Sequence, residues 1–131
     1  MANAKTRERV ANGCADFLDS DLFKALCEPV RIEIVRLLIA RGRSDLSEIA
    51  AELPQDSSVI SRHLAVLDRA GLVRRIKSGR HVYCELDGPE IVARLEEIVE
   101  ALKRAVPFCC PGSSQTEAAR PNARPRRREA L

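Results

Sequence analysis

Two groups of residues in this 131-residue chain are suited to recognition or chemistry. The first is the polar stretch SSVISRHLAVLDRAG over residues 57–71, which runs directly into the basic sequence LVRRIKSGRHVYCEL over residues 72–86. The second is a set of five cysteines, of which Cys109 and Cys110 are adjacent in VPFCCPG. Serine and arginine side chains can hydrogen-bond base edges, and thiolates bind soft ions. The sequence therefore points to DNA recognition and to a sulfur site.

The composition restricts the class of protein. The net charge is +3, the hydrophobic fraction is 45% and the aromatic fraction is only 3%, so we expect an aliphatic core of packed helices. No apolar run approaches the ~18 residues that a membrane span needs, and the first ten residues lack the apolar part of a signal peptide. We therefore expect a cytoplasmic protein without a membrane partner. The odd number of cysteines indicates thiols or metal ligands rather than a disulfide framework.

Residues 44–54 and 57–71 have the pattern of two short helices joined by a tight polar turn. Ser44 is the expected N-cap of the first helix, and Asp56 or Ser57 can cap the second. This arrangement is typical of a helix-turn-helix motif, whose second helix presents its N-terminal turns to the major groove. The residues expected to read DNA there are Gln55, Ser57, Ser58, Ser61, Arg62 and His63. Among them Arg62 is best suited to a bidentate contact with guanine, worth about 1–3 kcal/mol of discrimination.

The alternating pattern over residues 72–86 predicts a β-hairpin that turns at Ser78-Gly79. Its basic side chains are expected to neutralise phosphates, which positions a protein on DNA without specifying a sequence. These side chains are Arg74, Arg75, Lys77 and Arg80. A serine at a helix start is more often a cap, and an arginine cluster is more often a solvated face. The combination of helix, turn, helix and basic hairpin is far more specific than any single residue in it.

The order of these segments resembles one known family. FKALCEPVRIEIVRLL, DLSEIAAEL, SSVISRHLAVLDRAGLV and SGRHVYCEL together are similar to the ArsR/SmtB family of winged-helix repressors, over roughly residues 18–106. The resemblance implies a mainly α fold with four helices, a β-hairpin wing and a fifth helix. It also implies a homodimer without enzymatic activity, which binds double-stranded operator DNA and releases it when an inducer binds.

The resemblance also suggests a division of the chain. Residues 1–17 are expected to form an N-terminal dimerisation helix, and residues 18–106 the winged helix-turn-helix core, ending in a C-terminal dimerisation helix. That last helix carries a continuous apolar stripe from Ile91 to Val106, which either completes the core or contacts a partner. Residues 107–131 are expected to hold the cysteine pair and a disordered Arg-rich tail.

The resemblance leaves the inducer site open. Family members that sense arsenic or cadmium have cysteines where this chain has SDLS over residues 44–47, and the last helix lacks the histidines that others use for zinc, nickel or cobalt. Sulfur ligands remain. We expect Cys109 and Cys110, with Cys84 across the dimer as third thiolate, to bind an As(III) or Sb(III) species such as arsenite, an organoarsenical or antimonite. No constitutive cofactor is expected.

Two alternatives stay open at this point. Cys14 competes with Cys84 for the role of third ligand, and Cys27 is expected in the core, since an unmodified cysteine behaves as a small hydrophobe. The cysteines could instead sense oxidants or persulfides in a repressor of the same fold, which requires a lowered thiol pKa.

Overall fold

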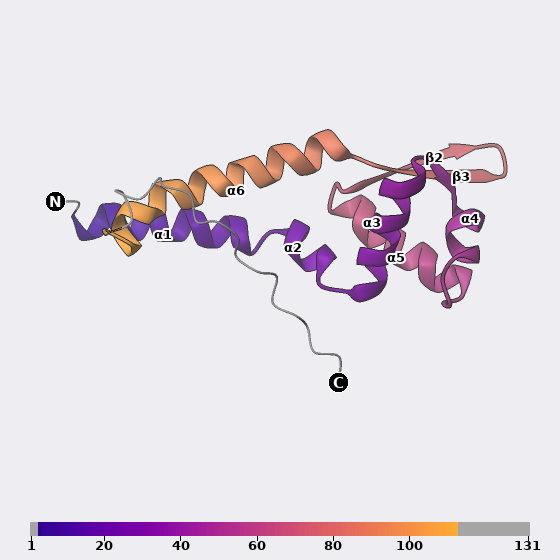
Figure 1. Cartoon of the computed structure of the whole chain (residues 1–131), viewed down its shortest axis with the longest axis horizontal. Helices are drawn as coiled ribbons and strands as arrows, with labels where there is room; N and C mark the ends of the chain where they lie inside the picture. The colour runs from indigo at the N-terminus through magenta and orange to yellow at the C-terminus, as the bar shows by residue number, and fades with distance from the viewer. Residues whose placement is uncertain (1–2, 113–131) are drawn as a thin grey trace.

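The computed structural model describes residues 3–112, in which helices dominate and one small antiparallel sheet forms (Figure 1). The Arg-rich tail predicted for residues 113–131 lies outside the described residues. The elements are α1 (Ala4–Leu18), α2 (Asp21–Leu26), α3 (Pro29–Arg41), β1 (Ser44–Asp45), α4 (Leu46–Ala51), α5 (Ser57–Arg69), β2 (Val73–Ser78), β3 (His81–Leu86) and α6 (Gly88–Cys109).

The chain has two parts, which we call the winged head and the helical arm. The winged head contains α3, α4, α5 and the sheet, whereas the helical arm consists of α1 lying along α6 (Figure 1). The core lies mainly in the head and is aliphatic, as the composition predicts. Its fully covered side chains include Leu22, Ile34, Ile60, Leu64, Leu67, Leu72, Val73 and Cys84.

The sheet confirms the predicted hairpin and adds a strand to it. β2 pairs with β3 from Val73↔Leu86 to Ser78↔His81, and Gly79 adopts a φ of 61° in the turn, which suits a residue without a Cβ. On its other edge β3 pairs with the two-residue strand β1, so the strand order is β1-β3-β2. A strand of two residues is too short to produce a periodic signal in the sequence.

The cap of α4 differs from the predicted one. Ser44 belongs to β1, and Asp45 is the N-cap, because its side chain accepts a hydrogen bond from the Ser47 N–H at 3.1 Å. Glu48 completes the capping box by accepting from the Asp45 N–H at 3.2 Å. The box requires partners three positions apart in the sequence, and Glu48 lies three positions after Asp45 but four after Ser44.

The arm is an antiparallel helix pair. Arg7 Nη2 donates to the Phe108 carbonyl at 3.2 Å, and Cys14 Sγ donates to the Ala101 carbonyl at 3.3 Å. At 1.5 Å per residue, the 22-residue α6 is about 33 Å long. It runs from the base of the wing to the far end of the arm, beside the N-terminus (Figure 1).

Helix α6 ends later than the sequence predicts. The sequence predicts that the last helix ends at Val106, but it continues through Pro107 to Cys109, and the N–H of Cys110 bonds to the Val106 carbonyl at 2.8 Å. A proline this close to a helix end removes one backbone donor, and the contact of Arg7 with Phe108 holds the last turn. The cysteine pair is therefore the end of a helix rather than part of a loop.

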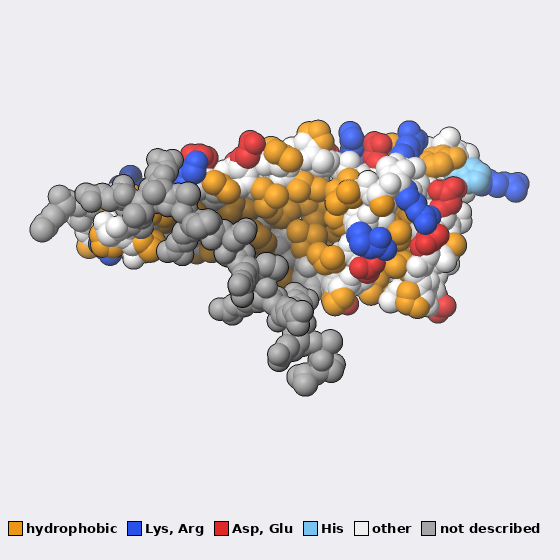
Figure 2. Space-filling model, in the orientation of Figure 1, with side chains coloured by type: hydrophobic (Ala, Val, Ile, Leu, Met, Phe, Trp, Pro, Cys, Tyr) orange, Lys and Arg blue, Asp and Glu red, His pale blue; other side chains and the backbone are white. Residues whose placement is uncertain are grey.

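The predicted single stripe on α6 is in fact two stripes, of which the outer one has alternating spacings of three and four residues. The inner stripe faces α1 and the core, and consists of Ile91, Ile98, Ala101, Ala105 and Phe108. The outer stripe is exposed, and consists of Val92, Leu95, Val99, Leu102 and Val106. Hydrophobic side chains also gather along the arm and at its junction with the head in the face that Figure 2 shows. Within the described residues, no helix is long and apolar enough to cross a bilayer.

Candidate nucleic-acid interface and cysteine pair

Helices α4 and α5 form the predicted helix-turn-helix, and α5 is strongly amphipathic. Ile60, Leu64 and Leu67 bury one face of α5 in the head. Asp56 is its N-cap by backbone geometry, and no hydrogen bond from its side chain supports the cap. The N-terminal turns of α5 therefore point their other face away from the core, as a DNA-reading helix requires.

The predicted base-reading residues differ in how accessible they are. Ser57, Ser58 and Arg62 are exposed on the first turns of α5, and Ser61 and His63 are partly covered. Gln55 is also partly covered, and its Oε1 is buried without a hydrogen-bond partner among the described residues. The structure thus brings the three exposed side chains together on one surface, and holds Gln55 at its edge.

The basic residues of the hairpin divide into two pairs. Arg74 forms ion pairs with Glu85 at 3.3 Å and Asp87 at 3.8 Å, and Arg75 forms one with Asp68 at 2.9 Å. By contrast, Lys77 and Arg80 are exposed near the tip, and neither forms an ion pair within residues 3–112. The tip residues can reach phosphates without first breaking an internal contact.

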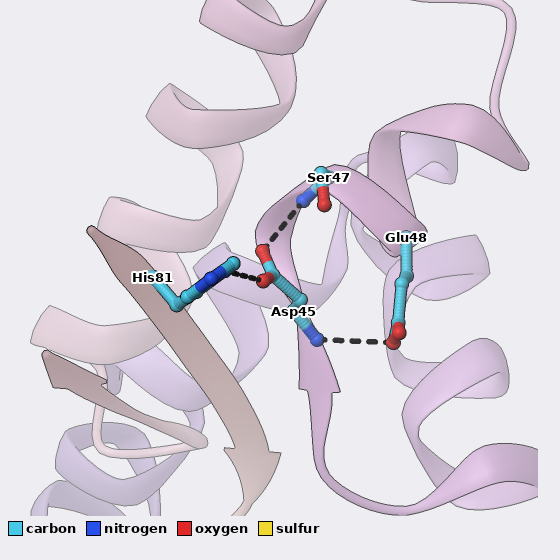
Figure 3. Close-up of polar contacts among 4 residues, drawn as sticks. All are labelled: Asp45, Ser47, Glu48 and His81. Atoms are coloured by element: carbon cyan, nitrogen blue, oxygen red, sulfur yellow. Dashed lines mark hydrogen bonds and ion pairs between the residues drawn. The ribbon is translucent and has the colours of Figure 1, made fainter. Parts of the chain in front are cut away.

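A hydrogen-bonded contact that no pattern in the sequence predicts joins the wing to the N-cap of α4. His81 Nδ1 lies 2.5 Å from Asp45 Oδ2, so one carboxylate serves both the capping box and the wing (Figure 3). The Ser47 N–H and His81 hold the pKa of Asp45 below its usual value of 3.8. Only the pairing of β1 with β3 brings these residues together, and no spacing in the sequence indicates that pairing.

A second contact joins the arm to the recognition helix. Arg94 on α6 is held by Glu90 at 2.9 Å, and its Nη1 donates to the Ala70 carbonyl at the C-terminal end of α5. The next residue, Gly71, has a φ of 77°, and a Cβ there would lie 2.9 Å from the Arg94 guanidinium. These contacts join α6 directly to the C-terminal end of α5.

Cys109 and Cys110 are exposed at the end of α6, and their Sγ atoms lie 3.6 Å apart. The hydrogen bond with the Cys109 thiol raises the pKa of Cys110 above its usual value. An ion about 2.3 Å from both sulfurs, which is a typical length for a Zn–S bond, would have a sulfur–ion–sulfur angle of about 103°. The pair has the spacing of two sulfurs that share one soft ion.

The other three cysteines lie elsewhere. Cys84 is fully buried in the middle of the sheet, between Ser44 and Arg75, and burial raises the pKa of its thiol. Since α6 separates Cys84 from the pair by about 33 Å, the two do not meet within one protomer. A buried thiol in a paired strand argues against Cys84 as a third ligand and favours a core role.

Cys14 does not reach the pair within one protomer either. It contacts Ala101, which precedes Cys109 by eight residues, or about 12 Å along the helix. Cys27 was predicted to be in the core, but it is exposed at the end of α2, where its Sγ donates to the Phe23 carbonyl. In the described part of the chain, no group of three His, Cys, Asp or Glu residues could hold a metal ion.

Comparisons with known proteins agree with this architecture. Residues 28–75 match the family model described as bacterial regulatory protein, arsR family. The uncharacterised HTH-type transcriptional regulator Rv0081 of Mycobacterium tuberculosis H37Rv is 33% identical over 68% of this chain and 78% of its own length. The chain belongs to the ArsR family. It is a winged helix-turn-helix transcriptional regulator, since its relatives and structural neighbours are regulators rather than enzymes.

Two further matches are a repressor from Escherichia coli and a solved structure from Mycobacterium bovis. The arsenical resistance operon repressor of Escherichia coli K12 is 36% identical over 63% of this chain and 70% of its own length. A homodimeric winged helix-turn-helix domain from Mycobacterium bovis, a possible ArsR-family regulator, has a TM-score of 0.51 and 26% identity over 79% of this chain and 90% of that one.

Proposed function

We propose that this protein is a DNA-binding repressor that releases its operator when a soft thiophilic inducer binds Cys109 and Cys110. The observation that carries the proposal is the 3.6 Å separation of the two sulfurs at the end of α6, the helix that begins at the base of the wing. The similarity to an arsenical resistance repressor supports arsenic or antimony species as the inducers.

In this proposal the head reads DNA with two sets of residues. Ser57, Ser58 and Arg62 contact base edges in the major groove, with Ser61, His63 and Gln55 beside them. Lys77 and Arg80 neutralise phosphates from the wing tip. Arg74 and Arg75, although part of the same basic cluster, primarily hold the wing in place through their ion pairs.

The functional unit in this proposal is a homodimer. The outer stripe of α6 leaves large apolar side chains in water, with Val92 54% and Val99 49% exposed. Its alternating three- and four-residue spacing is that of a helix that packs against another helix. The homodimeric relative supports the same arrangement here. Two recognition helices about 34 Å apart would then read an operator with two-fold symmetry.

Release would follow from a change at the arm. An inducer that binds the free dimer more tightly than the DNA-bound dimer shifts the protein towards the free form, and nothing else is required thermodynamically. The bond from Arg94 to the end of α5 provides a direct mechanical path from α6 to the recognition helix.

The geometry of the pair favours metalloid sensing over oxidant sensing. Neighbouring residues have Cα atoms about 3.8 Å apart across a trans peptide, which is less than the ~4.4 Å lower limit of ordinary disulfides. A disulfide between the two residues would therefore be strained, whereas the 3.6 Å separation of the two sulfurs suits a shared ion. A persulfide donor therefore serves as a test of the alternative.

The decisive experiment measures operator release by fluorescence anisotropy. The operator would be a duplex selected from a random pool by the reduced protein, and titrants would be arsenite, phenylarsine oxide, antimonite, cadmium, zinc and a persulfide donor. Wild type would be compared with Cys109→Ser/Cys110→Ser, and Cys27→Ser is the matched control, because Cys27 is also exposed.

We expect arsenic or antimony species to release DNA from wild type and from Cys27→Ser, but not from the double variant. Release by the persulfide donor alone would replace metalloid sensing with redox sensing. Release from the double variant at wild-type concentrations would show that the inducer does not act through the pair.

A further inference from the structure

The cysteine pair offers two sulfurs, and the described residues supply no third soft donor near them. All five cysteines and both histidines of the chain lie within residues 3–112, so the inventory of thiols and imidazoles in one protomer is complete. Cys14 is held two turns away against Ala101, and Cys84 is buried at the other end of α6. A trivalent ion with three covalent bonds would therefore keep one bond to a group of its own.

A groove begins at the same cysteine. It has a volume of about 320 Å³, lies between α1 and the last turns of α6, and includes Cys109 in its wall. Its other lining residues are Arg7, Glu8, Val10, Ala11, Ala105 and Phe108. Arg7 and Glu8 are the charged lining residues, and the Arg7 guanidinium lies 5.9 Å from the centre of the Phe108 ring. Val10, Ala11, Ala105 and Phe108 make the rest of the lining beside Cys109 apolar.

On α6, the groove lies on a different face from the outer stripe, which is the surface proposed to contact the second copy of the chain. It lies on the side of α6 that carries the inner stripe, to which Ala105 and Phe108 belong. The outer stripe is displaced from the inner stripe by about a third of a turn, at 3.6 residues per turn. Dimerisation through the outer stripe does not use the residues of α6 that line this groove.

We propose that the preferred inducer is a trivalent arsenical with one organic substituent, which binds through arsenic to Cys109 and Cys110 and places the substituent in this groove. The inference rests on the proposed function, because it specifies the inducer of that site. An apolar substituent gains from leaving water, whereas the hydroxyl that inorganic arsenite retains on its third bond gains nothing from an apolar wall.

The binding step balances without a redox partner. The dihydroxy form of the arsenical, R–As(OH)₂, reacts with two thiols to give R–As(S-Cys)₂ and two water molecules. Two As–O bonds break and two As–S bonds form, and each thiol proton leaves with a hydroxyl group as water. Arsenic remains trivalent throughout.

The test compares release of operator DNA by phenylarsine oxide, methylarsenite and arsenite. We expect phenylarsine oxide to release wild type at a concentration at least about tenfold lower than arsenite, with methylarsenite between them, because each step buries less apolar surface. Ala11→Phe, which fills the groove, should raise the concentration of phenylarsine oxide needed by about tenfold and leave that of arsenite unchanged. Ala15→Phe is the matched control, since Ala15 is exposed on α1 and does not line the groove.

Two outcomes would overturn this inference and leave the proposed function intact. One is equal release of wild type by arsenite and phenylarsine oxide, and the other is an unchanged response of Ala11→Phe to phenylarsine oxide. Loss of the response in Cys14→Ser/Cys27→Ser would also overturn it, since a third thiol would then be required. Failure of every arsenic species to release wild type would instead reject the proposed function.

Discussion

The winged head and the helical arm are built from the same kinds of aliphatic residues, but they differ in what covers them. In the head, Ile60, Leu64 and Leu67 are completely buried by the chain itself. In the arm, α1 has no buried residue, and α6 leaves Val99 and Leu102 about half exposed. The head is complete within one chain, whereas the arm has an apolar surface that requires a partner.

The cysteines show the same contrast at the level of single residues. Cys84 in the head is fully buried, and this burial raises the pKa of its thiol. Cys109 and Cys110 in the arm are exposed and within 3.6 Å of each other. The environment that the fold provides, rather than the residue type, decides which thiols are available for chemistry.

The largest effect is expected from charged substitutions in the outer stripe, which should prevent dimerisation without unfolding the protein. Val99→Glu/Leu102→Glu places two charges in the outer stripe, so we expect a folded monomer whose operator affinity is lower by a factor of about 100 or more, because binding by two linked heads is lost. Sedimentation velocity and operator anisotropy measure the two effects. Ala93→Glu, on the polar face of the same helix, should remain dimeric, and a dimeric double variant would show that the outer stripe is not the interface.

The next effect tests whether the head alone reads sequence. Arg62→Ala should weaken operator binding by about 1–3 kcal/mol without changing binding to random duplex DNA or the oligomeric state. Lys77→Ala should instead weaken both kinds of binding and reduce the salt slope by about one. Competition anisotropy at several salt concentrations distinguishes these results. An equal loss on operator and random DNA for Arg62→Ala would contradict a base contact.

Local patterns in the sequence predict much of the head. The apolar spacing in α5 and the alternation around Ser78-Gly79 are set by the burial of one face, and both predictions were confirmed. The pairing of Arg74 with Glu85 could also have been found, because a turn at Ser78-Gly79 that pairs Ser78 with His81 puts Arg74 opposite Glu85. The prediction of phosphate contacts for Arg74 considered its positive charge but not its position opposite Glu85 in the hairpin.

Features that depend on distant contacts could not be predicted in the same way. The contact between His81 and Asp45 exists because β1 pairs with β3, and a two-residue strand has no periodicity. The extension of α6 past Pro107 depends on the packing of α1 against its last turns. The exposure of Cys27 and the burial of Cys84 likewise follow from tertiary position rather than from residue type.

A smaller effect tests the assignment of Cys84 to the core. Cys84→Ala should lower the free energy of unfolding by about 0.5–1.5 kcal/mol, as does the loss of one buried methyl group. The inducer concentration for operator release should not change, because the thiol lies at the opposite end of α6 from the pair. Urea unfolding and anisotropy test the two statements. A response to arsenicals that disappears in Cys84→Ala would restore Cys84 as a ligand across the dimer.

The smallest effect concerns the acid stability of the head. Asp45 has a lowered pKa in the folded protein, so its carboxylate contributes stability that is present above its usual value of 3.8 and is lost as the pH falls through the folded pKa. Asp45→Asn can still cap α4 but carries no negative charge beside His81. We therefore expect wild type to exceed Asp45→Asn in stability at neutral pH, and the difference to shrink as the pH falls below 3.8. Urea unfolding across that range measures it, with Asp16→Asn on the exposed face of α1 as control. A difference that is independent of pH would mean that Asp45 acts through its shape in the capping box, and that its charge does not hold the wing.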